Sequence, residues 1–199
     1  MEVQTTTLLV LLFFGSISCN AARVYDSKKA TTNANDDFIT LSCQNTTYPS
    51  TCVASLSGFS STIRSSLLEL SRAAVSVTLT AAVDTSALVN RLSTKGALTP
   101  QEAAAVEDCV AMVGNSVKEL EKSLDAMGGM RRSGETVAVE NVQTWVSAAL
   151  TDENTCMGGF EGGDVDGVVK RVVRRHVVGL AQLTSNALAL LVGLSNSSP

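Results

Sequence analysis

Apolar residues recur at alternating spacings of three and four along most of the chain beyond residue 60. That spacing keeps side chains on one face of an α-helix. The pattern predicts four long helices, over roughly residues 61–94, 99–127, 133–156 and 164–194. The stripes expected to face the core are Ile63, Leu67, Leu70, Ala74, Val77 and Ala81; Val106, Val110, Val113, Val117, Leu120, Leu124 and Met127; Val139, Val142, Val146 and Ala149; and Val165, Val169, Val172, His176, Leu180, Leu183, Ala187, Leu190 and Leu194.

Signals at the helix ends indicate how these helices connect. Thr99-Pro100-Gln101-Glu102 offers an N-cap hydroxyl, a proline at the first helical position and a glutamate at the third. Gly96 closes the preceding helix, and Gly128-Gly129 closes this one. Short connections force neighbouring helices to run antiparallel, so we expect an all-α fold, an antiparallel up-down four-helix bundle.

The N-terminal segment differs from the rest in composition. Leu8 to Ile17 is a short apolar run, too short to cross a bilayer, and small or polar residues follow it up to Ala22. We therefore predict a signal peptide over residues 1–22, a flexible leader over 23–35 and one folded domain over 36–199. No Lys or Arg precedes the apolar run, and a buried N-terminal helix is the alternative. On the first interpretation the protein is secreted and not membrane-embedded.

The cysteines fit a secreted chain. Cys19 falls in the predicted signal peptide, which leaves Cys43, Cys52, Cys109 and Cys156, a set with three possible pairings. We favour Cys43–Cys52 and Cys109–Cys156, because a turn at residues 48–49 would close an N-terminal helical hairpin and antiparallel helices would bring the second pair together. A zinc site is disfavoured, since no Cys-x-x-Cys pair is present.

Two glycosylation sequons point to the same compartment. Asn45-Thr46-Thr47 and Asn196-Ser197-Ser198 match the acceptor pattern Asn-x-Ser/Thr. The pattern is short, but Asn45 and Asn196 are the candidate acceptors.

The residues needed for catalysis are largely missing. There is one histidine, His176, interpreted as structural or solvated, and no nucleophile motif accompanies it. Asp152 and Glu153 are interpreted as solvated surface groups rather than a catalytic pair. The sequence predicts no catalytic residue, no metal site and no cofactor. A net charge of −4 disfavours a nucleic-acid partner.

A basic run in the last helix is the main concentration of charge. It consists of Lys170, Arg171, Arg174 and Arg175. The run is either a solvated face or a contact for an acidic partner.

Four segments resemble one known family, the plant invertase and pectin methylesterase inhibitors. They are the Cys43/Cys52 pair around Tyr48-Pro49, the motif Val106-Glu107-Asp108-Cys109, the stretch from Val142 to Leu150 leading to Thr155-Cys156 and Phe160, and the stretch from Leu183 to Leu190. The resemblance implies the bundle with its hairpin and two disulfides, no cofactor, and an inhibitor that covers its target's active-site cleft in a one-to-one complex. It further implies partner contacts at Asn115 and Lys118 on the second long helix, and at Gln143, Ser147, Thr151 and Thr155 on the third.

The resemblance leaves the target open. Invertase inhibitors of the family carry a Pro-Lys-Phe element near the last hairpin, and here the matching stretch, residues 160–165, reads Phe-Glu-Gly-Gly-Asp-Val. We therefore expect a pectin methylesterase inhibitor of the apoplast and cell wall, which is not itself an enzyme. An invertase inhibitor is the alternative. A second alternative is a non-inhibitory wall protein that binds pectin, with which Lys170, Arg171, Arg174 and Arg175 could make contact.

Overall fold

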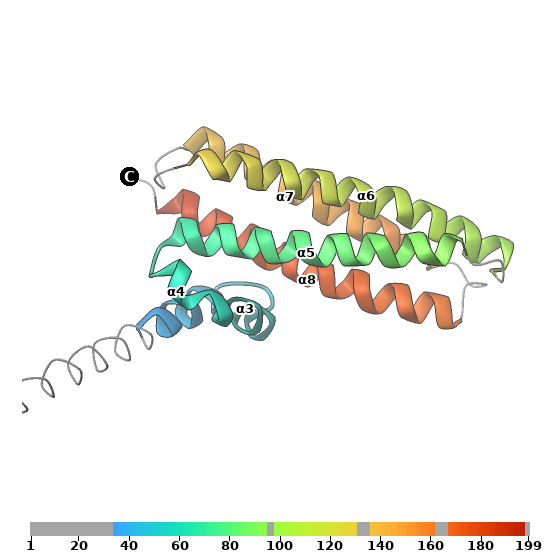
Figure 1. The fold of residues 1–199 in the computed structure, drawn as a ribbon, viewed down its shortest axis with the longest axis horizontal. Helices are drawn as coiled ribbons and strands as arrows, with labels where there is room; N and C mark the ends of the chain where they lie inside the picture. Colours follow the sequence, from blue (N-terminus) through green and yellow to red (C-terminus); the bar gives the residue numbers. More distant parts are fainter. Residues whose placement is uncertain (1–33, 95–97, 131–135, 162–166, 198–199) are drawn as a thin grey trace, which may run out of the picture.

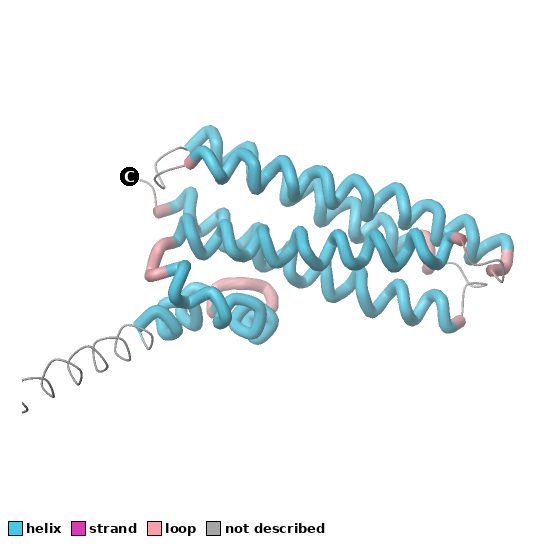
Figure 2. The backbone as a smooth tube through the Cα atoms, in the orientation of Figure 1, coloured by secondary structure: helices cyan, strands magenta, loops and turns pink. Residues whose placement is uncertain are grey.

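The computed structural model describes residues 34–94, 98–130, 136–161 and 167–197, and this part of the chain consists of helices joined by turns (Figure 2). The four long helices are α5 (Leu67–Ser93), α6 (Pro100–Gly129), α7 (Thr136–Gly158) and α8 (Val168–Asn196). The predicted signal peptide and most of the leader lie outside the described residues. The first described helix already includes residues 34 and 35, two residues before the expected start of the folded domain.

The long helices form a closed ring. They run alternately in opposite directions, and each packs against two neighbours: α5 and α7 both contact α6 on one side and α8 on the other (Figure 1). This arrangement confirms the predicted all-α up-down bundle.

A smaller helical unit packs against one half of this bundle. The helix over residues 34–43 turns into α3 (Pro49–Leu56), and Ser57–Phe59 and α4 (Ser60–Ile63) lead on to α5 (Figure 1). Helix α3 contacts both α5 and α8. The predicted hairpin is therefore confirmed, and it packs against the bundle near the start of α5 and the end of α8.

Both favoured disulfides are present. Cys43 pairs with Cys52, with Cα atoms 5.6 Å apart, and closes the hairpin. Cys109 pairs with Cys156, with Cα atoms 4.5 Å apart, and joins α6 to α7. Each bridge restricts the unfolded chain, and the second closes the longer loop and should stabilise more.

The predicted start of α6 is confirmed, whereas the predicted start of α5 is wrong. At α6 the capping box is complete: Thr99 Oγ1 accepts from the Glu102 amide at 3.2 Å, and the Glu102 carboxylate accepts from the Thr99 amide at 3.0 Å. Helix α5, however, begins at Leu67 and not near Ser61. Arg64 and Ser65 adopt positive φ angles of 44° and 59°, which ends α4 and redirects the chain.

The core stripes of α5, α6 and α8 are centred differently from the prediction, because small hydroxyl residues occupy core positions. Buried residues alternate at spacings of three and four, the repeat of coiled-coil packing. In α5 this repeat reads Leu68, Ser71, Val75, Thr78, Ala82, Thr85, Val89 and Leu92; in α6 it reads Val106, Cys109, Val113, Ser116, Leu120, Ser123 and Met127; in α8 it reads Val173, Val177, Leu180, Thr184, Ala187, Leu191 and Leu194.

Several residues expected in the core lie at its edge instead. Nine of them are only partly buried: Leu67, Val77, Ala81, Val110, Val117, Leu124, Val169, Val172 and Leu183. His176 is exposed, so its prediction as a stripe residue was wrong, while its interpretation as a solvated group holds. The stripe of α7 was predicted correctly, since Val139, Val142, Val146 and Ala149 are all buried.

Helices α5 and α8 each contain a long apolar stretch. Among the described residues, these two helices satisfy a length-and-composition test for membrane spans, with 18-residue windows of mean hydropathy 1.3 and 1.8. Both pack their buried stripe against two other helices of the bundle, as core helices of a soluble protein do.

Candidate functional site

The six residues predicted to contact a partner lie on the outer surface of α6 and α7. Asn115 and Lys118 are exposed on α6, and Ser147, Thr151 and Thr155 are exposed on α7. Gln143 is half-buried. Two cross-helix contacts set the register of this antiparallel pair: Cys109 lies opposite Cys156, and Lys122 lies opposite Trp145. By that register, Asn115 and Lys118 are level with residues 147–151.

The four α7 residues wind around their helix rather than forming one flat stripe. Each step of four residues rotates a side chain by about 40° about the helix axis, so Gln143 and Thr155 differ by about 120°. Gln143 and Ser147 line a shallow groove of about 530 Å³ whose other wall is Leu188 and Val192 of α8. The Gln143 amide donates to the Leu191 carbonyl of α8 at 3.0 Å. Thr155 is therefore turned away from the groove that Gln143 lines.

The threonine hydroxyls on this surface are held by their own helix. Thr151 Oγ1 donates to the Ser147 carbonyl at 2.9 Å, and Thr155 Oγ1 donates to the Thr151 carbonyl at 2.8 Å. A hydroxyl that donates in this way keeps its lone pairs and its methyl neighbour free for a partner. Thr151 and Thr155 thus offer hydrogen-bond acceptors and small apolar contacts, and they carry no charge.

The seam between α6 and α7 contains a charged and aromatic group that sequence reasoning did not select. Lys122 Nζ lies 4.3 Å from the centre of the Trp145 ring and 3.6 Å from the Glu119 carboxylate. Partial burial, and secondarily the negative charge of Glu119, raise the pKa of Asp152. The position of Trp145 at the edge of the α7 stripe was the available signal for this group.

Glu153 was predicted to be a solvated surface group, and that prediction was wrong. Its side chain is fully buried, and one oxygen, Oε1, accepts from Ser116 of α6 at 2.7 Å and from Thr184 of α8 at 2.9 Å. Burial raises the pKa of Glu153 to about 7, although the two hydroxyl hydrogen bonds oppose this rise. The helical repeat indicated this burial, because residue 153 follows the buried residues 142, 146 and 149 at the next spacing of four.

The other oxygen of this carboxylate is Oε2. It has no hydrogen-bond partner within the described part of the chain. An unpaired buried oxygen disfavours the charged form of the group. Glu153 therefore joins α6, α7 and α8 across the bundle through one oxygen only.

The basic run lies at the start of α8. Arg171, Arg174 and Arg175 are exposed, and Lys170 is partly exposed. None of these side chains forms an ion pair with a residue in the described ranges. They therefore place four cationic side chains close together on this part of the surface.

The described residues do not assemble a metal or catalytic centre. They contain no group of three or more His, Cys, Asp or Glu side chains placed to hold a metal ion. The acidic pair Asp152 and Glu153 is divided, since Asp152 is partly exposed and Glu153 is sealed in the core. The predicted partner contacts lie elsewhere, on the outer surface of α6 and α7.

Comparison with known proteins agrees with this fold. Over 205 residues the chain is 40% identical to pectinesterase inhibitor 9 of Arabidopsis thaliana, a match that covers 96% of this chain and 94% of that protein. It is 42% identical over 159 residues to a 21 kDa protein of Daucus carota, covering 78% and 82% of the two chains. The crystal structure of a mutant form of an Arabidopsis pectin methylesterase inhibitor has the same fold, with a TM-score of 0.59, 21% identity, and coverage of 79% of this chain and 94% of that one.

A family model settles the relationship. The sequence model described as plant invertase/pectin methylesterase inhibitor matches residues 37–190, a span that contains both disulfides and all four long helices up to the last turns of α8. The chain belongs to the plant invertase/pectin methylesterase inhibitor family.

Proposed function

We propose that this protein is a secreted inhibitor of pectin methylesterase that acts from the apoplast by binding the enzyme one-to-one over its active-site cleft. The names of its relatives support the target, since several Arabidopsis proteins at 33–45% identity are called pectinesterase inhibitors. The predicted signal peptide, the disulfides and the sequons support secretion.

The observation that carries the proposal is the outer surface of α6 and α7, defined by Asn115, Lys118, Ser147, Thr151 and Thr155. The Cys109–Cys156 bridge joins the two helices beside it, and the Lys122–Trp145 contact joins them further along. A surface that is rigid before binding loses little conformational freedom in the complex. The small uncharged side chains of Ser147, Thr151 and Thr155 cost little to desolvate and can accept hydrogen bonds from a partner.

The experiment is a titration of the mature protein against a plant pectin methylesterase, followed by methanol release, with an acid invertase in parallel. We expect loss of esterase activity that saturates at one inhibitor per enzyme, and no effect on sucrose hydrolysis. Inhibition of the invertase alone would transfer the proposal to the family's other target.

A matched pair of variants tests the surface itself. Thr155→Arg places a bulky charge on α7, and Thr80→Arg makes the same change on α5, which does not adjoin α7. Both threonines are exposed and donate to the carbonyl four residues earlier. We expect Thr155→Arg to weaken inhibition at least tenfold and Thr80→Arg to leave it unchanged. Equal inhibition by the two variants would refute the proposed surface.

We further propose that the basic run of α8 contacts anionic pectin. The support is its concentration of positive charge, because four neighbouring cations on one part of the surface attract a polyanion in a salt-dependent way. The test is retention on immobilised polygalacturonate as salt is raised. A triple variant, Arg171→Gln, Arg174→Gln and Arg175→Gln, should elute at lower salt than the parent protein. Retention without inhibition of either enzyme would favour a non-inhibitory pectin-binding protein.

A further inference from the structure

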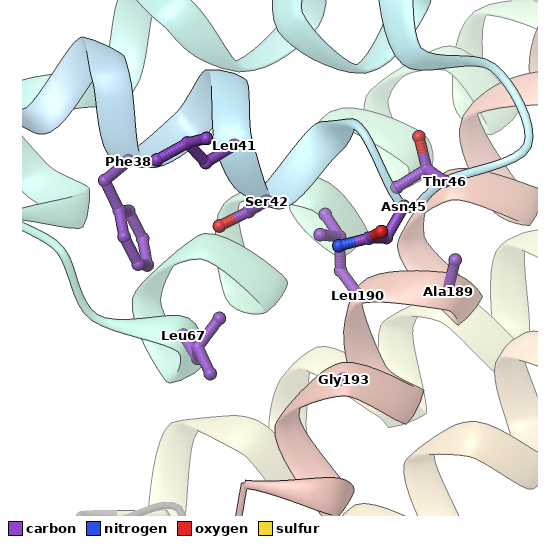
Figure 3. Close-up of a pocket in the computed structure, with 9 residues that line it drawn as sticks. All are labelled: Phe38, Leu41, Ser42, Asn45, Thr46, Leu67, Ala189, Leu190 and Gly193. Atoms are coloured by element: carbon purple, nitrogen blue, oxygen red, sulfur yellow. The ribbon is translucent and has the colours of Figure 1, made fainter.

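An open groove separates the N-terminal hairpin from the bundle. It has a volume of about 340 Å³ and is lined by Phe38, Leu41, Ser42, Asn45, Thr46, Leu67, Ala189, Leu190 and Gly193 (Figure 3). This volume is near the lower end of the range of about 300–1,000 Å³ that small-molecule sites have. Leu41 remains 61% exposed on one wall, a large apolar side chain that the protein itself leaves uncovered.

The wall of the groove formed by the first helix ends at Asn45, the asparagine of the first sequon. Phe38, Leu41, Ser42 and Asn45 follow one another at spacings of three, one and three, which places them along one face of the first helix and its last turn. Asn45 is exposed, whereas its neighbour Thr46 is buried and donates its hydroxyl to the Cys43 carbonyl at 2.8 Å. In Figure 3 the Asn45 amide is directed into the space between the hairpin and α8.

The opposite wall leaves room beside this amide. Ala189 and Gly193 lie four residues apart on α8 and present only small groups to the groove. A Cβ atom added to Gly193 would meet nothing within 4 Å. The groove thus combines apolar walls, open space and an amide that matches the acceptor pattern.

We propose that Asn45 carries an N-linked oligosaccharide whose first sugar packs into this groove against Leu41 and the α8 wall. The inference rests on the secretion that the proposed function includes. In the transfer, Asn45 Nδ2 bonds to the anomeric carbon of a lipid-diphosphate-linked oligosaccharide and gives up one proton. The anomeric carbon–oxygen bond breaks, and the lipid diphosphate leaves with its electron pair.

A sugar suits the groove because its ring is amphipathic. One face of a pyranose ring presents carbon-bound hydrogens, which can cover Leu41 and Leu190, while the hydroxyl groups stay at the solvent rim. Removing apolar surface from water stabilises the folded state in proportion to the area covered. The covalent link also keeps the sugar at high local concentration, so weak contacts suffice.

The experiment compares three glycoforms of the protein, secreted from a eukaryotic host that makes oligomannose chains. All carry Asn196→Gln, so that Asn45 is the only acceptor under test. One keeps its whole glycan, one is trimmed by an endoglycosidase to the first sugar, and one is the Asn45→Gln variant without sugar. Mass spectrometry of the Asn45 peptide, thermal unfolding and the fluorescence of an apolar dye are measured for each.

We expect the peptide mass to show an oligosaccharide on Asn45. The one-sugar form should unfold at the same temperature as the full glycoform, and Asn45→Gln should unfold roughly 2–4 °C lower and bind more dye. In a Leu41→Ser background, the difference between the one-sugar and sugar-free forms should shrink, because one wall of the contact is gone.

Three results would overturn the inference. They are an unmodified Asn45, equal unfolding temperature and dye binding with and without the first sugar, and self-association through the groove in light scattering of the glycosylated protein. Esterase inhibition is measured alongside, and Asn45→Gln should inhibit like its parent, since α3 of the hairpin packs on α5 and α8 and no residue of the proposed α6–α7 surface lines the groove. Failure of every form to inhibit would refute the proposed function and leave the glycan result standing.

Discussion

The buried carboxyl of Glu153 makes a specific prediction about stability and pH. It is fully buried between α6, α7 and α8, and Ser116 and Thr184 both donate to its Oε1. Glu153→Gln keeps the shape and keeps one oxygen to accept those two hydrogen bonds. The amide cannot ionise, so the substitution removes the charge and retains most of the packing.

The direction and the size of the effect of pH on the free energy of unfolding follow from the pKa of Glu153, which burial raises from 4.5 to about 7. Between these values the native state holds a proton that the unfolded state has released, so the free energy of unfolding falls as pH rises. The contribution is complete below pH 4.5 and is lost once the pH has passed about 7. This rise in the pKa of Glu153 corresponds to about 3 kcal/mol of free energy of unfolding, a large share of the stability of a domain.

The assay is urea unfolding followed by helix circular dichroism at a series of pH values. The wild-type protein should lose about 3 kcal/mol across this window, and Glu153→Gln should lose much less. Glu121→Gln, an exposed change on α6, is the matched control and should keep the wild-type slope. Parallel pH profiles for Glu153→Gln and its parent would refute the reasoning.

Three further predictions concern contacts between elements. Asn186→Ala should destabilise by about 1–3 kcal/mol in urea unfolding and speed hydrogen exchange in the hairpin, because Asn186 accepts from the Tyr48 amide and donates to the Tyr48 carbonyl, each at 2.9 Å. Arg72→Ala should cost about 1.5–3 kcal/mol by the same measure, since its guanidinium donates to carbonyls at the end of α6 at 2.7 and 3.2 Å. Replacing Cys109 and Cys156 together by Ala should cost about 4 kcal/mol, measured against the parent under oxidising conditions; a cost that vanishes would show that packing alone holds α6 to α7.

The core stripes of α5, α6 and α8 were predicted off centre for one physical reason. Counting only apolar residues located each helix, because Leu, Val and Ala dominate the stripes, but it shifted the centre of three stripes. The true repeat includes Thr78 and Thr85, whose hydroxyls donate to carbonyls of their own helix at 2.8 and 2.7 Å. A hydroxyl that donates within its own helix can be buried at little cost, so the polarity of these residues wrongly indicated that they are exposed.

The start of α5 was misplaced for a local reason. The apolar spacing from Ile63 to Leu67 suggested continuity, but Ser66 caps the helix by accepting from the Glu69 amide at 3.3 Å. Ser66 and Glu69 form the spacing of a capping box, which was present in the sequence. The left-handed backbone at Arg64, by contrast, gave no signal, because arginine has no special preference for that conformation.

The candidate binding residues were placed by family resemblance, and the structure adds what holds them. Short-range patterns predicted the helices that carry Asn115 and Thr155, and cysteine spacing predicted the bridge between those helices. The supporting contacts from Glu153 to Ser116 and Thr184 join residues 37 and 31 positions apart. Nothing local in the sequence pairs such residues, because their contact depends on the register of three helices at once.

These contacts bear directly on how an inhibitor without catalytic groups can be effective. On the proposed binding mode, its affinity depends on how little the α6–α7 surface reorganises on binding, since ordering side chains and helices costs free energy. The disulfide holds the surface at Cys156, and three residues earlier Glu153 ties the same turn of α7 to α6 and α8. The hydrogen bonds that Glu153 accepts therefore fix the turn of α7 that carries the exposed threonines on either side of it, Thr151 and Thr155. Stability of the core and preorganisation of the proposed binding surface depend on the same buried group.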